Sequence, residues 1–259
     1  MSTVIYPSPI FGPVHSRRLG VSLGVNLMPP DGKVCTFDCL YCECGFNSDF
    51  PAHDRRPTRE EVHDALKAVL LRRHTDGEPL DCITFSGNGE PTGHPDFPDI
   101  IADTVALRDR FFPEAKVSVL SNATFAGSER VRNALMLVDN NIMKLDTVDA
   151  EYIRMVDRPV QKGYDVHKVV ESLKMFKGHV MIQTMFMTGT ADGRSVDNTG
   201  DRFIVPWLET LREIGPCGVM IYTVDRDTPA HGLRKAAPQV LDDIRNRVEA
   251  MGIRCSVAY

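Results

Sequence analysis

The sequence predicts an α/β fold in which parallel strands alternate with helices. Six short apolar runs are each followed by a segment whose apolar residues recur at helical spacing. Such alternation indicates parallel strands joined by helical crossovers, and right-handed crossovers curl the strands into a full or partial barrel. The length of 259 residues suits an α/β barrel formed by one domain. We therefore expect a single domain, residues 1–259, without an internal repeat or a linker.

Glycines, prolines and capping residues place the elements along the chain. Residues 1–18 contain Pro7, Pro9 and Pro13, which favour an extended segment packed on the body of the protein. A capping box at 58–61 begins the first helix. The predicted strands cover 21–28, 81–86, 116–120, 141–145, 179–187 and 218–224, the later helices 97–110, 128–137, 164–176, 201–214 and 240–248, and an edge strand 253–257. Residues 188–200 are polar, and we expect them to form a loop and a lid that faces the substrate.

The composition indicates which classes of protein the chain does not resemble. It has 30 Lys and Arg against 35 Asp and Glu, a formal net charge of -5, which gives no general attraction for nucleic acid. The seven cysteines accompany no secretory signal at the start, so a reducing compartment is expected rather than a disulfide framework. No window approaches the roughly 18 to 20 apolar residues that a membrane span needs. We therefore expect a cytoplasmic protein that does not enter a membrane.

Three cysteines carry the clearest chemical signal. Cys35, Cys39 and Cys42 fall within eight residues at the spacing CxxxCxxC, directly after the first predicted strand. Three thiolates on one loop can hold three irons of a cubane cluster and leave the fourth iron open to a small molecule. A zinc knuckle is the alternative, but it normally needs a second Cys or His pair, and His53 has no partner three to five residues on. Cys44 could substitute as a ligand or remain a half-buried free thiol.

This spacing, with the aromatic Tyr41 just before the last cysteine, resembles the signature of the radical S-adenosylmethionine (radical SAM) superfamily. The resemblance implies an incomplete (β/α)6 barrel that binds a [4Fe-4S] cluster and S-adenosylmethionine. It further implies reduction by an external one-electron donor of flavodoxin or ferredoxin type. S-adenosylmethionine would then be cleaved to a 5′-deoxyadenosyl radical that abstracts hydrogen from a substrate, with the cofactor carrying the difficult chemistry.

A glycine-rich segment with a carboxylate forms the second motif. Gly87-Asn88-Gly89-Glu90-Pro91 follows the second predicted strand and resembles the Gly-Gly-Glu-Pro stretch of radical SAM proteins, with Asn88 in place of one glycine. The resemblance implies that Asn88, Gly89 and Glu90 bind the ammonium group of S-adenosylmethionine. An ordinary glycine turn is the alternative.

Later strand ends offer polar groups for the rest of the cofactor. Ser121 and Asn122 could bond ribose oxygens or cap a loop. Lys144 and Asp146 point to one face, which in a barrel covered by apolar helices is the lumen; they could bind the cofactor's carboxylate and amine or ribose, or neutralise one another. Further candidate cofactor contacts are Tyr41, Gln183 and Tyr222. Arg226 could meet an anionic substrate group, although packing explains Gln183, Tyr222 and Arg226 equally well.

Two further segments suggest a branch of the superfamily. Residues 12–20 (Gly-Pro-Val-His-Ser-Arg-Arg-Leu-Gly) and 222–226 (Tyr-Thr-Val-Asp-Arg) resemble a stand-alone branch related to the tRNA wyosine-base synthases. The acidic balance and the lack of a basic extension argue against tRNA, and paired arginines at 17–18, 55–56 and 72–73 are the candidate phosphate contacts. The leading interpretation is therefore a radical SAM enzyme acting on an unidentified small molecule, peptide or protein. A tRNA-modifying enzyme and a non-catalytic iron-sulfur electron carrier are the alternatives.

Overall fold

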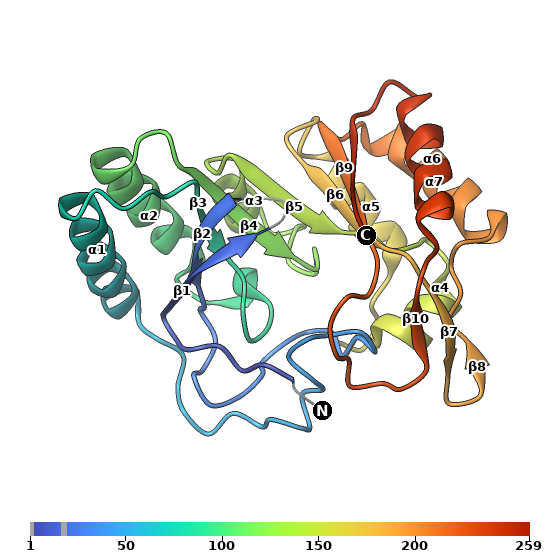
Figure 1. The fold of residues 1–259 in the computed structure, drawn as a ribbon, viewed down its shortest axis with the longest axis horizontal. Coiled ribbons are helices and arrows are strands. Elements are labelled where there is room, and N and C mark those ends of the chain that lie inside the picture. Colours follow the sequence, from blue (N-terminus) through green and yellow to red (C-terminus); the bar gives the residue numbers. More distant parts are fainter. Residues whose placement is uncertain (1–2, 17–19) are drawn as a thin grey trace.

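The computed structural model describes residues 3–16 and 20–259, and its centre is one eight-stranded sheet. The strands lie in the order β1 (Ile10–Ser16), β2 (Gly20–Val25), β3 (Cys82–Phe85), β4 (Lys116–Ser121), β5 (Asn140–Lys144), β6 (Met181–Met185), β9 (Gly218–Tyr222) and β11 (Cys255–Ala258). All neighbours from β2 to β11 are parallel, and β1 is antiparallel to β2. The sheet curves into an open arch rather than a closed barrel (Figure 1). The predicted α/β partial barrel is confirmed.

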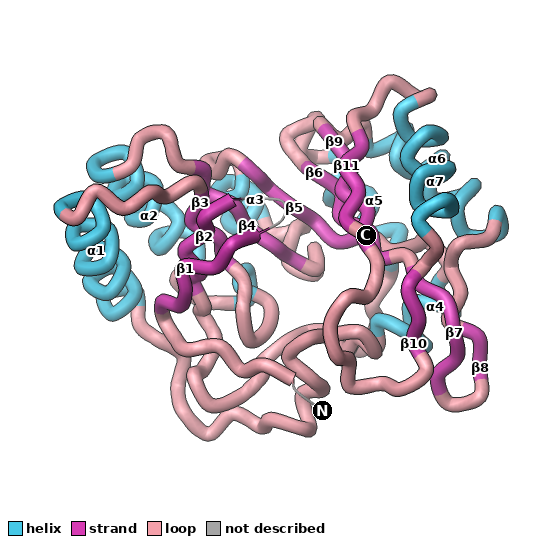
Figure 2. The backbone as a smooth tube through the Cα atoms, in the orientation of Figure 1, coloured by secondary structure: helices cyan, strands magenta, loops and turns pink. Residues whose placement is uncertain are grey.

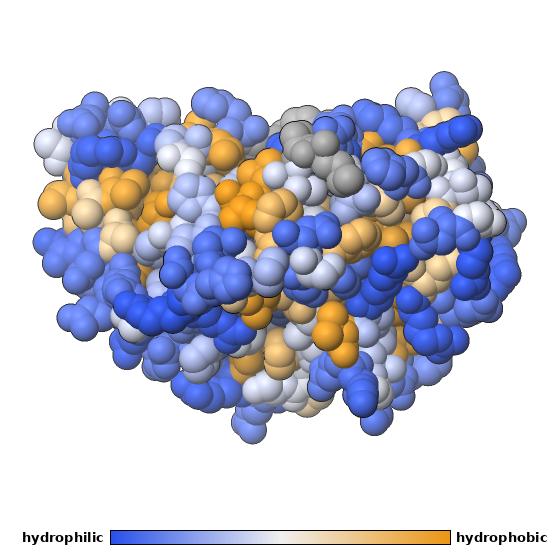
Figure 3. All heavy atoms as spheres, turned by 90° about the horizontal axis from the view of Figure 1, so that it is seen from below, coloured by the Kyte–Doolittle hydropathy of each residue, from blue (hydrophilic) through white to orange (hydrophobic). Residues whose placement is uncertain are grey.

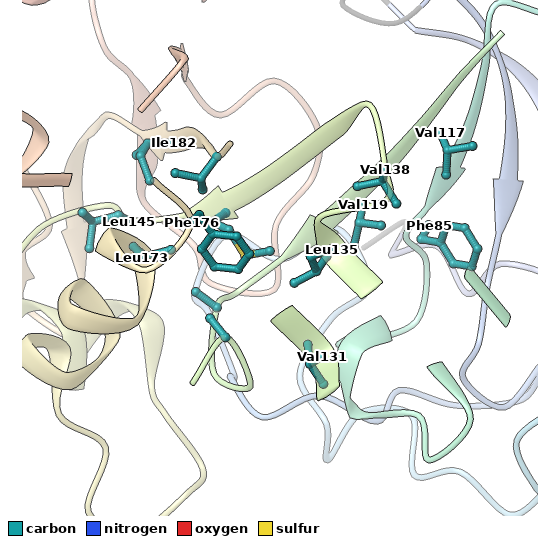
Figure 4. Packing of buried hydrophobic residues seen from close by; sticks show 14 of the residues in the cluster. Phe85, Val117, Val119, Val131, Leu135, Val138, Leu145, Leu173, Phe176 and Ile182 are labelled. Atoms are coloured by element: carbon teal, nitrogen blue, oxygen red, sulfur yellow. The ribbon is translucent and has the colours of Figure 1, made fainter. Parts of the chain in front are cut away.

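The longer helices lie along the convex side of this arch, as Figures 1 and 2 show. They are α1 (Arg59–Thr75), α2 (Phe97–Phe111), α3 (Glu129–Leu135), α5 (Val166–Lys174), α6 (Asp201–Ile214) and α7 (Pro238–Glu249). Their apolar side chains and the outward-facing strand residues form the main core. In Figure 4, Leu135 of α3 lies near Val119 of β4, and Leu173 of α5 lies near Leu145 at the end of β5. Because the helices cover the convex face of the sheet, the opposite, concave face is the one that can carry an active site.

Local sequence signals account for the helix boundaries. The side chain of Thr58 accepts a hydrogen bond from the backbone N–H of Glu61, whose side chain accepts one from the backbone N–H of Thr58, so the predicted capping box is present at the start of α1. Asp165 caps α5 through the N–H of His167. At the end of α6, Gly215 adopts a positive φ of 60°, a conformation that favours glycine.

Three expectations about the chain are corrected. The segment 1–18 was expected to be merely extended, but its residues Ile10–Ser16 form β1, which covers the edge of β2; residues 1–2 and 17–18 lie outside the described residues. The strand expected over 179–187 divides, because β6 ends at Met185 and β7 (Met187–Ala191) begins a second sheet. The polar segment 188–200 is therefore no plain loop: β7 pairs with β8 (Arg194–Ser195) and with β10 (Leu233–Lys235). Its role as a lid remains a prediction.

Hydrophilic residues cover most of the face seen from below, with hydrophobic residues showing between them (Figure 3). Among the residues that the structure describes, no helix is long and apolar enough to cross a membrane.

Candidate active site

The three motif cysteines lie on a loop, residues 33–50, that follows β2 at the carboxyl edge of the sheet. Loops from several strand ends gather at this edge, below the sheet in Figure 2. Cys35, Cys39 and Cys42 are all free thiols; Cys39 is buried and the other two are half-buried. Burial is the main cause that raises the pKa of Cys39, and the neighbouring thiols of Cys42 and Cys35 add to it. We call residues 33–50 the cysteine loop.

One flank of the cysteine loop is bound to the glycine-rich segment. The N–H of Val34 donates to the carbonyl of Asn88 (2.9 Å), and the N–H of Glu90 donates to the carbonyl of Val34 (3.3 Å). Gly89 lies between these bonds with φ +149°, and a Cβ there would come within 1.9 Å of the Val34 carbonyl oxygen. Only glycine permits so close an approach. The backbone of the second motif is therefore fixed directly beside the first cysteine.

The other flank is bound to a single turn of π-helix, Ile153–Asp157. The N–H of Leu40 donates to the carbonyl of Val156 (2.9 Å), and the N–H of Asp38 donates to the carbonyl of Asp157 (3.1 Å). π-helical turns occur frequently at functional sites. The cysteine loop is thus held between segments that belong to different parts of the barrel.

The thiols differ in their readiness to ionise. Burial raises the pKa of Cys35 to about 12 and holds the pKa of Cys39 well above its ordinary value. A hydrogen bond from Cys44 and the nearby Lys33 ammonium lower the pKa of Cys42 to about 6. Cys35, Cys39 and Cys42 form no disulfide bond. Because thiolates are the ligands that hold iron-sulfur clusters, these three residues are a donor set that suits such a cluster. Among the residues described, no three His, Cys, Asp or Glu side chains lie close enough together to hold a single metal ion.

Glu90 is the centre of a closed hydrogen-bonded group. Its carboxylate accepts from the N–H (3.0 Å) and hydroxyl (2.5 Å) of Thr92, the hydroxyl of Ser121 (2.8 Å) and the N–H of Asn122 (2.6 Å). The carboxylate is buried, and burial raises its pKa although these bonds oppose the change. We call Glu90, Thr92, Ser121 and Asn122 the Glu90 cluster. It ties the end of β3 to the end of β4.

The side-chain amides of Asn88 and Asn122, which neighbour Glu90, are also hydrogen-bonded to the protein. The Asn88 side chain is buried; it accepts from the N–H of Tyr6 (2.8 Å) and donates to the carbonyls of Tyr6 and Pro29 (both 2.9 Å). The Asn122 amide donates to the hydroxyl of Thr36 (2.8 Å) and lies 3.7 Å from the sulfur of Cys35. The side chains of Asn88, Glu90 and Ser121 are therefore all hydrogen-bonded to the protein itself.

Lys144, which is half-buried, forms a second group with the buried carboxyl groups of Asp146 and Asp157. Its ammonium lies 2.8 Å from the carboxylates of both Asp146 and Asp157. The hydroxyl of Tyr41 donates to Asp146, and the N–H of Met185 donates to the other oxygen of Asp146 (2.9 Å). The ammonium also lies over the Tyr41 ring, 5.7 Å from its centre. We call Lys144, Asp146, Asp157 and Tyr41 the Lys144 cluster.

Burial and charge act in opposite directions within the Lys144 cluster. Burial alone would lower the pKa of Lys144, but the two carboxylates outweigh it and hold that pKa well above its ordinary value. Burial raises the pKa of Asp157 to about 7, with Lys144 opposing and Asp146 adding to the shift. One ammonium thus faces two carboxyl groups, and as the pH rises through about 7 the ionisation of Asp157 gives the group a net negative charge that suits a cationic ligand.

The remaining candidates extend the same inner face. Gln183 is paired in register with Lys144, and Tyr222 with Met185, so these side chains continue the face of the Lys144 cluster. Gln183 and Tyr222 are both half-buried. The opposite face, with Ile182, belongs to the helix-covered core.

Arg226 was expected to meet a substrate anion, but its guanidinium is paired with Glu43 of the cysteine loop (2.6 Å). Arg17 and Arg18 lie outside the described residues.

Two residues of this site were missed by the sequence analysis. Asp157 follows no strand and matches no motif, so nothing in the sequence marked it. Lys33 could have been noticed as a charged residue two positions before Cys35, although its burial could not.

Comparison with known protein families shows to which family the chain belongs. The pattern of the radical SAM superfamily matches residues 30–193, well over half of the chain. The chain belongs to the radical SAM superfamily. Members of this superfamily use a [4Fe-4S] cluster and S-adenosylmethionine, and they need an external electron donor.

This radical SAM protein also resembles individual proteins. A UPF0026 protein of Helicobacter pylori is 30% identical over 224 residues, covering 85% of this chain and 67% of the relative. A radical SAM methyltransferase from Sphaerobacter thermophilus has a TM-score of 0.65 at 18% identity, covering 92% of this chain and 66% of that one. Streptococcus suis SuiB bound to S-adenosylmethionine has a TM-score of 0.63 at 13% identity, covering 91% and 49%. The chain thus spans about two thirds or less of the length of these proteins, and the structural likenesses show the fold alone.

Proposed function

We propose that this chain is a radical SAM enzyme that holds a [4Fe-4S] cluster on Cys35, Cys39 and Cys42 and acts on a small-molecule, peptide or protein substrate. When bound and reduced, the cluster supplies the electron that cleaves S-adenosylmethionine to a 5′-deoxyadenosyl radical. The observation that carries the proposal is the fixed position of the three free thiols between the Gly89 backbone and the Lys144 cluster, at the carboxyl ends of parallel strands. That is where barrels of this kind keep their chemistry.

The protein's own residues would position the cofactor in two ways. The carbonyl oxygen of Gly89 accepts no hydrogen bond from the residues described, so it is available to an ammonium group. The Lys144 cluster offers an ammonium to a carboxylate, and its two carboxylates attract the positive sulfonium and ammonium groups of S-adenosylmethionine. Phe37, Leu40 and Tyr41 are buried around the thiols and would exclude water.

The test is an anaerobic assay of the iron-loaded protein with dithionite and S-adenosylmethionine. We expect 5′-deoxyadenosine to form with the wild-type protein and not with the Cys39→Ala variant. A brown protein that binds iron but never cleaves S-adenosylmethionine would instead be an electron carrier. A colourless protein with one equivalent of zinc would remove the cluster from the proposal.

The narrower relation to the wyosine-base synthases stays a prediction. Part of the motif on which it depends, residues 17–19, lies outside the described residues, and Arg226 of the other part pairs with Glu43. An electrophoretic shift with tRNA that weakens steeply with added salt would support a tRNA substrate. Absence of any shift at low salt would leave the small-molecule, peptide and protein substrates.

A further inference from the structure

Lys33 is a buried cation that none of the cofactor-binding steps above uses. Its side chain is 1% exposed, although lysine is rarely buried without a partner. Its ammonium donates to the carbonyl of Gly45 (2.6 Å) and, at 3.4 Å, to the carboxylate of Asp38. An ammonium has three donors, so these two contacts leave one donor over.

The Lys33 ammonium lies inside the cysteine loop. Gly45, whose carbonyl accepts from this ammonium, donates its own N–H to the carbonyl of Cys42 (3.0 Å). Asp38, the other partner of the ammonium, directly precedes Cys39 in the chain. A buried positive charge is therefore held beside the second and third cysteines of the motif.

The backbone around Lys33 holds it rigidly. Its N–H donates to the carbonyl of Phe50 (2.8 Å), and Asp38 accepts from the N–H of Asn47 (2.7 Å). Asn47 in turn accepts from the N–H of Cys35 (3.1 Å). The ammonium thus belongs to the same hydrogen-bonded unit as the cysteine loop, and it cannot swing into solvent without breaking that unit.

We propose that Lys33 is a positioning residue that sets the reduction potential of the cluster by holding a fixed, buried positive charge inside the cysteine loop. The inference rests on the proposed function, because it requires a cluster on these thiols. The reduced cluster carries one more negative charge than the oxidised cluster, so a buried cation stabilises the reduced form more.

The experiment measures the midpoint potential of the iron-loaded protein by anaerobic redox titration with detection by electron paramagnetic resonance. In Lys33→Met we expect the ratio of reduced to oxidised cluster at a fixed potential to fall about tenfold, which for a one-electron couple is a midpoint lowered by about 59 mV. Lys33→Arg keeps the charge and should restore most of the difference. Lys67→Met removes an exposed lysine of α1 and should change nothing.

A second variant tests the opposite sign. Asp38→Asn removes the carboxylate that partly offsets Lys33, so its midpoint should rise while its iron content stays the same. If Lys33→Met does not fold, Asp38→Asn alone tests the role of Lys33. An unchanged midpoint in a folded, iron-loaded Lys33→Met, or an unchanged or lower midpoint in Asp38→Asn, overturns the role of Lys33. A wild-type protein that assembles no cluster overturns the proposed function instead, so the two failures are distinct.

Discussion

The Glu90 cluster and the Lys144 cluster lie at the same edge of the sheet, but they differ in how completely their charges and hydrogen bonds are matched. Glu90 accepts four hydrogen bonds from Thr92, Ser121 and Asn122. The Lys144 cluster places two carboxylates against one ammonium. The first group is satisfied by the protein itself, and the second is suited to an additional cation. We infer that the first builds the site and that the second binds the cofactor.

The largest effect should come from the cysteines that both clusters surround. Replacing Cys35, Cys39 or Cys42 singly with Ala should abolish iron binding and all formation of 5′-deoxyadenosine, because the cluster loses one of three ligands. Cys217→Ala is the control, since this thiol is exposed and directly precedes β9, at the end of the strand away from the cysteine loop. Iron content and product are measured after identical anaerobic reconstitution. Full iron loading in any of the three variants would contradict the assignment of the ligands.

Glu90→Gln should damage stability more than it damages cofactor contacts. Glutamine has a single acceptor oxygen and an NH2 group that would face donors, so part of the Glu90 cluster loses its partner while buried. We expect the free energy of unfolding to fall by about 3 kcal/mol, measured by anaerobic denaturation.

The control for this comparison is Glu209→Gln, at an exposed position of α6. It should leave stability unchanged. If Glu90→Gln is as stable as the wild type but binds S-adenosylmethionine poorly, the division between the two clusters is wrong.

Asp157→Asn should affect stability with a distinct pH dependence. The pKa of Asp157 is raised from its ordinary 3.8 to about 7, so between these values the folded protein holds a proton that the unfolded chain has lost. The folded state is thus progressively disfavoured as the pH rises toward 7. An asparagine does not titrate, so the variant should gain about 3 kcal/mol relative to the wild type between pH 5 and pH 8.

Calorimetry of both proteins at several pH values measures this difference directly. The subtraction removes groups that titrate alike in the two proteins. A difference that does not vary with pH would show that Asp157 is ionised throughout, and that Lys144 fully compensates it.

The smallest effect is expected at the margin of the Lys144 cluster. Gln183→Ala removes one hydrogen-bonding side chain beside Lys144, which should weaken S-adenosylmethionine binding by roughly threefold to tenfold. The measurement is equilibrium binding to the iron-loaded protein, with Gln239→Ala on α7 as the control. Unchanged affinity would restrict cofactor contacts to the Lys144 cluster itself.

Much of the fold follows from local sequence signals, and the failures have a common cause. The capping box at Thr58 and the apolar periodicity of the helices are local, and they place α1, α2, α3, α5, α6 and α7 to within a few residues. The pairing of β7 with β10 joins residues more than 40 positions apart, and no local pattern in 188–200 predicts it. Likewise β1 is a strand because β2 has an edge to cover, which three prolines in the same segment conceal.

In the candidate site, too, local sequence signals predicted some residues, and contacts between distant segments determined the others. Spacing alone identified Cys35, Cys39 and Cys42, and alternation alone placed Lys144 and Asp146 on one face. Asp157 joins them only because a π-helical turn brings it back to the end of β5. Glu90 was expected to contact the cofactor, and no local pattern predicts that its carboxylate accepts hydrogen bonds from Ser121 and Asn122 on the next strand end.

The central claim is that one iron of the cluster is left without a protein ligand and receives S-adenosylmethionine. The most direct test is the electron paramagnetic resonance spectrum of the dithionite-reduced protein recorded with and without S-adenosylmethionine. We predict that adding the cofactor changes the signal of the cluster, because a new ligand alters one iron. A cluster signal identical in both spectra, at a cofactor concentration that saturates binding, would contradict the account.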